Sequence, residues 1–257
     1  MAIDFELDDG IALITINRPE SSNALDADHY EALSRAWLRV RDEAAIQVAV
    51  ITGAGSKTFC AGADLKSWVG RDVDLAEVWL TQKGQLLNRG LEIWKPVLAA
   101  VNGACVGGGM TLLLATDIRV ATDNAVFRLA EVKRGIIAAN GGTQRIMQQL
   151  PYAIAMEMLL TGDKIDATTA LRWGLINKVV GQSELLDATL QYARRIRANA
   201  PLALQAAKEL AVRSRDMDMH TGLRMEQMVN RMLHRSEDAT IAKTAFSEKR
   251  EPKFTGR

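Results

Sequence analysis

The residues Pro96–Thr111 read PVLAAVNGACVGGGMT and combine an apolar strand, an Asn-Gly turn and a triple glycine. The strand is predicted to stop at Asn102-Gly103, and an apolar helical run is predicted from Met110 to Ala115. Glycines lack a Cβ, so such a loop can hold backbone N–H groups against a ligand, and the following helix adds partial positive charge. The segment suits a developing negative charge, but alone it fits a structural tight turn equally well.

Two further segments, one on each side, place small residues after a predicted strand. Residues 59–66 read FCAGADLK and follow the apolar strand Val48–Gly53, whereas residues 127–137 read FRLAEVKRGII and precede Asn140–Thr143. Three such segments in this order and spacing resemble the crotonase (enoyl-CoA hydratase/isomerase) family, from about Gly10 to the C-terminus. Residues 171–174, 233–238 and 245–252 are most similar to its carnitinyl-CoA dehydratase branch.

Composition limits the classes of partner. The chain has 257 residues, 48% of them hydrophobic, and Lys+Arg 32 against Asp+Glu 31 gives a net charge of +1. No overall field therefore marks it for nucleic acid or an anionic membrane. Residues 1–6 lack the features of a signal peptide and no apolar run approaches the length of a bilayer span, so we expect a cytoplasmic protein without a membrane partner. Cys60 and Cys105 are read as small half-apolar residues rather than a disulfide or metal pair.

The first 95 residues are predicted to form strands and helices, from sequence patterns that differ in strength. Strands at Phe5–Leu7 and Ile11–Ile16 turn at an Asp-Gly hairpin signal, and Asp26 is a candidate N-cap for the helix that follows. Residues 67–94 have poor periodicity, which predicts an irregular segment beginning near Gly70 and then a helix ending before Pro96. Trp68 and Trp79 in this segment could line a pocket or belong to the core.

Later residues are predicted to change from strands to helices. Strands are expected at 117–121 and 125–127, a helix at 141–150, and an almost wholly helical chain from Ile154, with helices at 155–160, 166–173, 183–198, 201–212, 217–233 and 236–246. The resemblance implies an α/β fold, a crotonase-type spiral of ββα repeats over residues 1–195, followed by an α-helical trimerisation region at 196–257. It also implies a homotrimer or a dimer of trimers.

The resemblance further implies an acyl-CoA substrate, with coenzyme A as part of the thioester and no separate cofactor or metal. The backbone N–H groups of Ala63 and Gly108 are expected to stabilise the negative charge that gathers on the thioester oxygen. Asp64 is expected to shape the turn of the donor loop. Contacts with the CoA ester are expected from Arg18, Ala24, Leu25, Ala61, Ala63, Asp64, Leu65, Lys66, Gly107 and Gly108.

The proton-transfer groups depart from the family pattern. Typical family hydratases use two glutamates; the second is present as Glu131, whereas Thr111 stands where the first would be. A threonine hydroxyl can hold a water or a substrate oxygen but is no base near neutral pH. Glu131 is therefore predicted to work as the single acid and base, with its pKa raised by apolar neighbours such as Phe127 and Ile136.

Several functions remain open at this point. Reversible hydration of an enoyl-CoA is favoured, with Δ3,Δ2-enoyl-CoA isomerisation and hydroxyacyl-CoA hydratase-lyase chemistry as alternatives. An acyl-CoA-binding protein without activity is a further alternative, and RNA binding through Arg35, Arg39 and Arg41 is a weaker one because acidic residues surround them. The histidines, His29, His220 and His234, lack metal-ligand spacing and are expected at the surface or an interface. No serine-nucleophile, dinucleotide-binding or P-loop motif is present.

Overall fold

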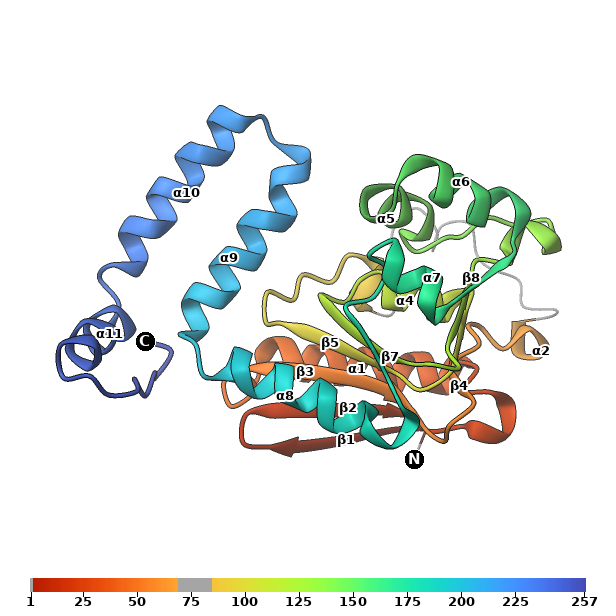
Figure 1. Cartoon of the computed structure of the whole chain (residues 1–257), viewed down its shortest axis with the longest axis horizontal. Coiled ribbons are helices and arrows are strands. Elements are labelled where there is room, and N and C mark those ends of the chain that lie inside the picture. The colour runs from red at the N-terminus through yellow and green to blue at the C-terminus, as the bar shows by residue number, and fades with distance from the viewer. Residues whose placement is uncertain (1, 69–84) are drawn as a thin grey trace.

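The structure, a computed structural model, describes residues 2–68 and 85–257. Its larger sheet has the order β1-β2-β3-β5-β7-β10 and is parallel except for the first pair (Figure 1). The strands are β1 Ile3–Asp8, β2 Ile11–Ile16, β3 Val48–Gly53, β5 Val97–Val101, β7 Ile118–Thr122 and β10 Lys178–Val180. The predicted hairpin is confirmed, since Asp9 (φ 44°) and Gly10 (φ 77°) both adopt the positive φ of its tight turn.

A smaller sheet explains how the chain spirals. It contains, in order, β4 Thr58–Cys60, β6 Ala104–Val106, β8 Val126–Arg128 and β9 Lys164–Asp166. Three consecutive strand pairs each place their first strand in the larger sheet and their second in the smaller one. Helices α4 Gly108–Leu113 and α5 Gly142–Gln149 follow the second and third pairs. This repetition is the predicted α/β spiral of ββα units, and it stacks the loops that leave β4, β6 and β8 at one edge.

Helix α1, Ala27–Asp42, covers the N-terminal part of the larger sheet. The predicted cap is confirmed, because the Asp26 carboxylate accepts a hydrogen bond from the backbone N–H of His29. Leu33, Trp37 and Val40 are buried at helical spacing, which fixes the helix against the core.

The C-terminal helices differ in how much they bury. Helix α8, Leu185–Arg197, packs across the larger sheet through Leu185, Ala188 and Ala193. Helices α9 Pro201–Arg213 and α10 Met219–Leu233 have no buried residue and extend from the core as a helical hairpin (Figure 1). The remaining helices are α2 Leu65–Trp68, α6 Tyr152–Thr161, α7 Ala167–Arg172, α11 Glu237–Ser247 and the 3₁₀ helices Pro19–Ser21, Leu87–Arg89, Glu131–Arg134, Gln182–Glu184 and Ser214–Asp216. No helix within the described ranges is long and apolar enough to cross a bilayer.

Some local predictions are wrong. Between Gln85 and Pro96 the chain forms only the short 3₁₀ helix Leu87–Arg89, which ends at Gly90 (φ 89°), so no helix reaches Pro96. Helix α4 begins and ends two residues earlier than predicted, and strands β6, β9 and β10 were not anticipated. Each of these strands has three residues, too few for an alternating pattern to stand out. Trp79 and the side chain of Trp68 lie outside the described residues.

Candidate functional site

Two glycine-containing loops meet at the edge of the smaller sheet. We call residues 61–64 and 107–109, which follow the paired strands β4 and β6, the donor loops. A Cβ on Gly62 (φ 88°) would lie 2.6 Å from the nitrogen of Gly108, and one on Gly108 would lie 3.4 Å from the nitrogen of Ala63. The amides of Ala63 and Gly108 are thus neighbours, as their proposed joint role requires. The contact depends on glycine because a side chain at Gly62 would intrude between them.

The first donor loop is held by the N-terminal loop of the chain. The N–H of Leu25 donates to the carbonyl of Gly62 (2.8 Å), and the N–H of Asp64 donates back to Leu25 (2.9 Å). One residue earlier, the N–H of Ala61 donates to Ser22 (3.1 Å). Because Leu25 pairs with Ala63 through these bonds to Gly62 and Asp64, the N–H of Ala63 points away from Leu25. Within the described residues, neither the N–H of Ala63 nor the N–H of Gly108 donates a hydrogen bond.

Arg18 joins the same assembly through its guanidinium. Its Nη1 donates to Asp64 Oδ2 (2.8 Å) and to the carbonyl of Ala24 (3.3 Å), and lies 3.4 Å from Asp26. The Arg18 guanidinium holds the pKa of the Asp64 carboxyl below its ordinary value, so this carboxylate is ionised. Its Oδ1 accepts from the N–H of Lys66 (3.1 Å), whose side chain is exposed, and Leu65 opens helix α2. The structure therefore gathers the expected CoA-contact residues on one edge, with Asp64 shaping the turn.

Glu131 approaches the triple glycine from the other side. It opens the 3₁₀ helix that follows β8, and a Cβ on Gly107 would lie 3.6 Å from its Oε1. Its Oε2 is buried and has no hydrogen-bond partner among the described residues. Burial raises the pKa of Glu131 above its ordinary value of 4.5, although a hydrogen bond from its own backbone and the charge of Arg134 act in the opposite direction. A carboxyl in this state can exchange a proton with a ligand beside the donor loops.

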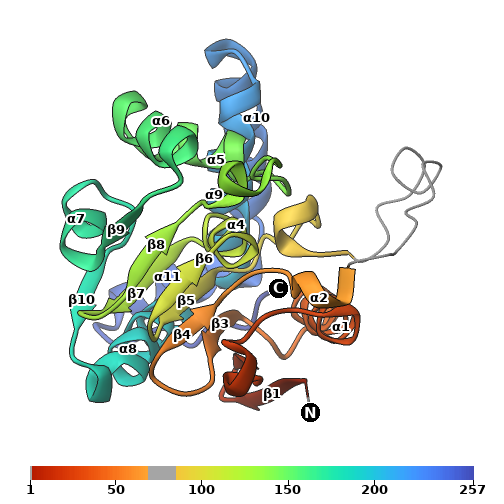
Figure 2. The ribbon, with the colours of Figure 1, turned by 90° about the vertical axis from the view of Figure 1, so that its right-hand side faces the viewer.

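The carboxyl of Glu131 lines an apolar cavity of about 310 Å³. Helices α5 and α6, which lie together over the end of the smaller sheet (Figure 2), supply much of its wall. The lining residues are Leu129, Glu131, Val132, Ile137, Ala138, Thr143, Met147, Met156, Leu159 and Leu160. Of the neighbours expected to desolvate Glu131, Phe127 is fully buried but Ile136 is 56% exposed, and neither lines the cavity. The sequence contained no signal for the α5 and α6 wall, because those residues follow Glu131 by up to 29 positions.

Thr111 is buried within the protein and hydrogen-bonded there. Its side chain is buried, its hydroxyl donates to the carbonyl of Gly108 (3.0 Å), and its oxygen accepts from Asn88 Nδ2 (2.9 Å). The carbonyl of Asn88 accepts in turn from Arg145 Nη1 (3.1 Å). Where typical family hydratases carry a carboxylate, this chain therefore has an uncharged threonine, whose hydrogen bonds to Gly108 and Asn88 steady the second donor loop. Asn88 was not predicted as a site residue because it lies in the segment of poor periodicity.

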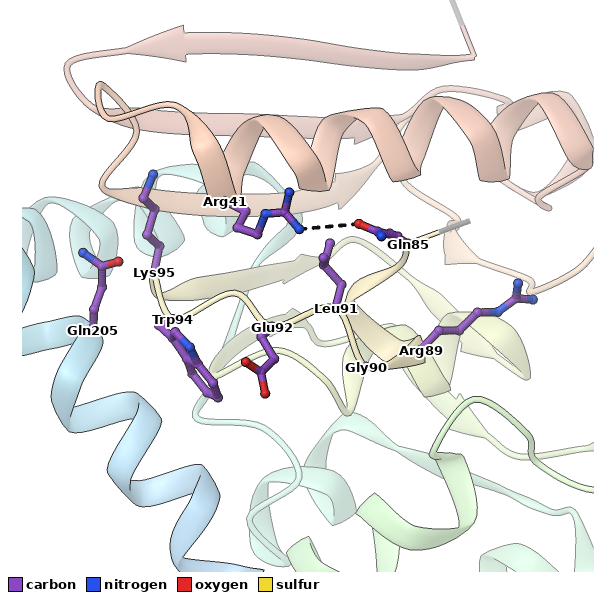
Figure 3. A pocket seen from close by; sticks show the side chains of 9 residues that line it. All are labelled: Arg41, Gln85, Arg89, Gly90, Leu91, Glu92, Trp94, Lys95 and Gln205. Carbon is purple, nitrogen blue, oxygen red and sulfur yellow. Dashed lines mark hydrogen bonds between the residues drawn. The ribbon is translucent and has the colours of Figure 1, made fainter. Parts of the chain in front are cut away.

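A larger cavity, about 750 Å³, lies between helix α1, residues 85–95 and helix α9 (Figure 3). Its charged groups are already engaged: Arg41 pairs with Asp42, and Lys95 Nζ donates to the carbonyl of Glu43 (2.7 Å). Arg89 extends away from Lys95 and Trp94 in this view. The cavity does not include the donor loops or Glu131, so we place the candidate site at the smaller one.

The histidines and cysteines lie apart from this chemistry. The histidines were expected at the surface or an interface. His29 is buried in the single chain and its Nδ1 lies 2.6 Å from Asp26 Oδ1, whereas His220 and His234 are exposed. Cys60 and Cys105 are buried free thiols, and burial raises the pKa of Cys60 to about 12. Within residues 2–68 and 85–257 no group of three or more His, Cys, Asp or Glu side chains could hold a metal ion.

Comparison with known proteins gives independent information about the family of this chain. The family model described as enoyl-CoA hydratase/isomerase matches residues 6–257. The chain is 41% identical over 256 residues to the (E)-benzylidenesuccinyl-CoA hydratase of Thauera aromatica, covering 100% of both. It is 39% identical over 252 residues to the carnitinyl-CoA dehydratase of Proteus mirabilis, covering 95% of this chain and 94% of that one.

Solved structures give the same result for the fold. The enoyl-CoA hydratase of Bacillus anthracis superposes with a TM-score of 0.92 at 32% identity, covering 100% of both chains. That of Mycobacterium tuberculosis H37Rv gives 0.90 at 36% identity, covering 100% of this chain and 99% of the other.

Proposed function

Because the chain belongs to the enoyl-CoA hydratase/isomerase family, we propose that it reversibly hydrates an enoyl-CoA thioester whose acyl group is bulky and apolar. One observation carries the proposal: a carboxyl with a raised pKa, Glu131, lies in an apolar cavity beside two converging backbone amides. Similar relatives are hydratases and dehydratases, which are lyases.

In the proposed mechanism the thioester oxygen binds between the N–H groups of Ala63 and Gly108. As water attacks Cβ, the carboxylate of Glu131 accepts a proton from it, and electrons shift through Cα to give an enolate held by the two amides. The carboxyl of Glu131 then returns the proton to Cα. Dehydration is the reverse sequence, so one carboxylate suffices for both directions.

The proposal assigns the two ends of the substrate to different parts of the site. The CoA portion lies along the edge formed by Arg18, Ala24 and Lys66, where cationic groups face a phosphorylated ligand. The acyl group enters the cavity of about 310 Å³, whose two methionines, Met147 and Met156, can adjust to its shape. The Thauera relative is named for a benzylidene-bearing thioester, which supports an aromatic acyl group here.

Turnover of a panel of thioesters tests this function. Crotonyl-CoA, cinnamoyl-CoA and a 3-enoyl-CoA are incubated with the protein, and loss or gain of the conjugated enoyl absorbance is followed. We expect faster hydration of cinnamoyl-CoA than of crotonyl-CoA, and kcat/KM should rise as pH increases through the pKa of Glu131, above 4.5. Binding without turnover of any member would instead support a non-catalytic acyl-CoA-binding protein.

Because Thr111 replaces a glutamate, a second reaction is also compatible with the site. With no carboxylate at that position, Glu131 alone could take a proton from C2 of a 3-enoyl-CoA and return it at C4, which is Δ3,Δ2 isomerisation. Conversion of the 3-enoyl-CoA without water addition would favour this alternative. Aldehyde release from a hydroxyacyl-CoA would instead indicate hydratase-lyase activity.

We also propose that the protein assembles as a trimer or a dimer of trimers through its C-terminal helices. Helices α9 and α10 have no fully buried residue in the single chain. Met219, Met228 and Met232 on α10 are 74%, 60% and 72% exposed, and Phe246 on α11 is 88% exposed. Apolar surface of this kind is characteristic of subunit interfaces. Light scattering at micromolar concentration should give three or six times the chain mass of 28.1 kDa; a monomeric or dimeric mass would contradict the proposal.

A further inference from the structure

A tyrosine hydroxyl reaches the point where the two donor loops meet. Tyr30 lies on α1, and its Oη is 3.5 Å from the position that a Cβ on Gly108 would occupy. That same position is 3.4 Å from the nitrogen of Ala63. The hydroxyl is brought there because α1 starts directly after Leu25, which the hydrogen bonds to Gly62 and Asp64 tie to the first donor loop.

From this convergence we propose that Tyr30 is a further catalytic residue, whose O–H donates a third hydrogen bond to the thioester oxygen beside the N–H groups of Ala63 and Gly108. The proposal rests on the function proposed above, since it needs a thioester bound at the donor loops. A third donor would stabilise the enolate more than the ground-state thioester, because charge on the oxygen grows along the reaction.

The surroundings of Tyr30 keep its hydroxyl protonated. The side chain is partly buried against the core, and this burial raises the pKa of Tyr30 to about 12. At neutral pH the group is therefore a donor rather than a phenolate. Its proton need not be transferred in the reaction, which leaves the acid-base work to Glu131.

The ring is also positioned from its other side. The guanidinium carbon of Arg89 lies 5.5 Å from the Tyr30 ring centroid, within the range of a cation–π contact. Arg89 Nε donates to Asn140 Oδ1 (2.9 Å), and Asn140 lies in the loop that follows the helix of Glu131. Arg89 is thus a positioning residue that links the tyrosine to the opposite side of the site, which accounts for its direction away from Lys95 and Trp94 in the larger cavity (Figure 3).

The test compares Tyr30→Phe with the matched control Tyr192→Phe. Tyr192 on α8 is also partly buried, with the guanidinium of Arg195 5.6 Å from its ring, but it packs against the far cluster of the larger sheet. Cinnamoyl-CoA serves as the probe, because donors at its thioester oxygen polarise the conjugated acyl group and shift its absorption to longer wavelength. Binding spectra are taken in a Glu131→Gln background, so that the probe is not consumed, and kinetics in the otherwise unchanged enzyme.

We expect Tyr30→Phe to reduce the spectral shift and to lower kcat about tenfold, with KM and the pH midpoint of kcat/KM unchanged. The loss should be smaller than the roughly 10²- to 10³-fold typical of removing one oxyanion donor, because two backbone donors remain. Tyr192→Phe should change neither quantity.

Three outcomes would contradict either the role of Tyr30 or the proposed thioester site, and they distinguish between the two. A full spectral shift in Tyr30→Phe would overturn the role of Tyr30 while leaving the donor loops intact. Absence of any shift in the Glu131→Gln protein, despite binding, would overturn the proposed thioester site itself. If Tyr30→Phe does not fold, 3-fluorotyrosine at position 30, whose hydroxyl is the more acidic donor, must increase the shift; an unchanged shift would again overturn the role.

Discussion

The two sides of the candidate site differ in the groups that form them, mainly backbone amides on one side and side chains on the other. On the donor side two of the three proposed donors, the N–H groups of Ala63 and Gly108, belong to the main chain, and a side chain at Gly62 would intrude on their contact. The hydrogen bonds of Leu25 with Gly62 and Asp64 hold the first of these loops in place. On the cavity side the working group is one carboxyl, Glu131, amid apolar side chains whose rim is exposed. In the mechanism proposed here the two sides therefore have different tasks: the fixed surface would stabilise charge, and the adaptable surface would select the acyl group and transfer the proton.

Glu131→Gln should cause the largest loss, because it removes the only acid-base group proposed for the cavity side. We expect kcat to fall by about 10²- to 10⁴-fold, the usual contribution of general acid-base catalysis, while thioester binding is retained. Glu157→Gln, an exposed change on α6, is the control and should leave the rate intact. An unaltered rate in Glu131→Gln would disprove the mechanism.

Gly62→Ala tests the donor side. The added methyl group would lie 2.6 Å from the nitrogen of Gly108, so it should displace that amide and lower kcat by about 10²- to 10³-fold. Gly55→Ala is the matched control: Gly55 has a similar φ of 80°, but its Cβ would meet nothing closer than Pro19 at 3.7 Å. Both variants introduce backbone strain, because alanine disfavours a positive φ. Thermal melting reports that strain, and steady-state kinetics measured beside it reports the loss of the donor. Equal activity in the two variants would argue against the donor assignment.

The same contrast explains how far the sequence could be interpreted. The donor loops and Glu131 were proposed from the sequence because three short local patterns resemble those of a known family, and the structure brings these segments together. The cavity wall and Asn88 were not, since they come together only through the packing of segments far apart in the chain. No α-helix runs up to Pro96, because the chain turns at Gly90 (φ 89°) and three consecutive residues, Leu86, Leu87 and Asn88, are all buried. The earlier part of the expected helix lies outside the described residues.

Thr111→Ala should separate steadying a donor loop from direct catalysis. Losing the hydroxyl leaves Asn88 Nδ2 without this acceptor, and an unsatisfied buried group costs about 1–3 kcal/mol of stability. We expect a lower melting temperature but less than a tenfold loss of kcat, about 1.4 kcal/mol or less in activation free energy. Thr189→Ala, which removes another buried hydroxyl on α8, gives the stability control. A larger kinetic loss with normal stability would instead indicate direct contact between Thr111 and the substrate.

The smallest expected effect is a pH-dependent gain in stability for Glu131→Gln. The pKa of Glu131 is raised in the folded protein, so ionisation opposes folding once the pH rises through the interval between 4.5 and the folded pKa. Below that interval both states are protonated and the penalty vanishes. The melting temperature of the variant should therefore exceed that of the wild type at pH 7.5 by more than it does at pH 4. A difference that does not grow with pH would show that the carboxyl is not desolvated.

Mutation during evolution acts differently on the two proposed main-chain donors of this site and on its side chains. A codon change alters a side chain but leaves the N–H of Ala63 or Gly108 in place unless it introduces proline, so selection there can act only on the size of the residues that shape the two turns. On the cavity side a codon change can remove, move or replace the proton-transfer group itself. Descendants of such a chain can therefore acquire a new reaction on a thioester while inheriting the same means of activating it.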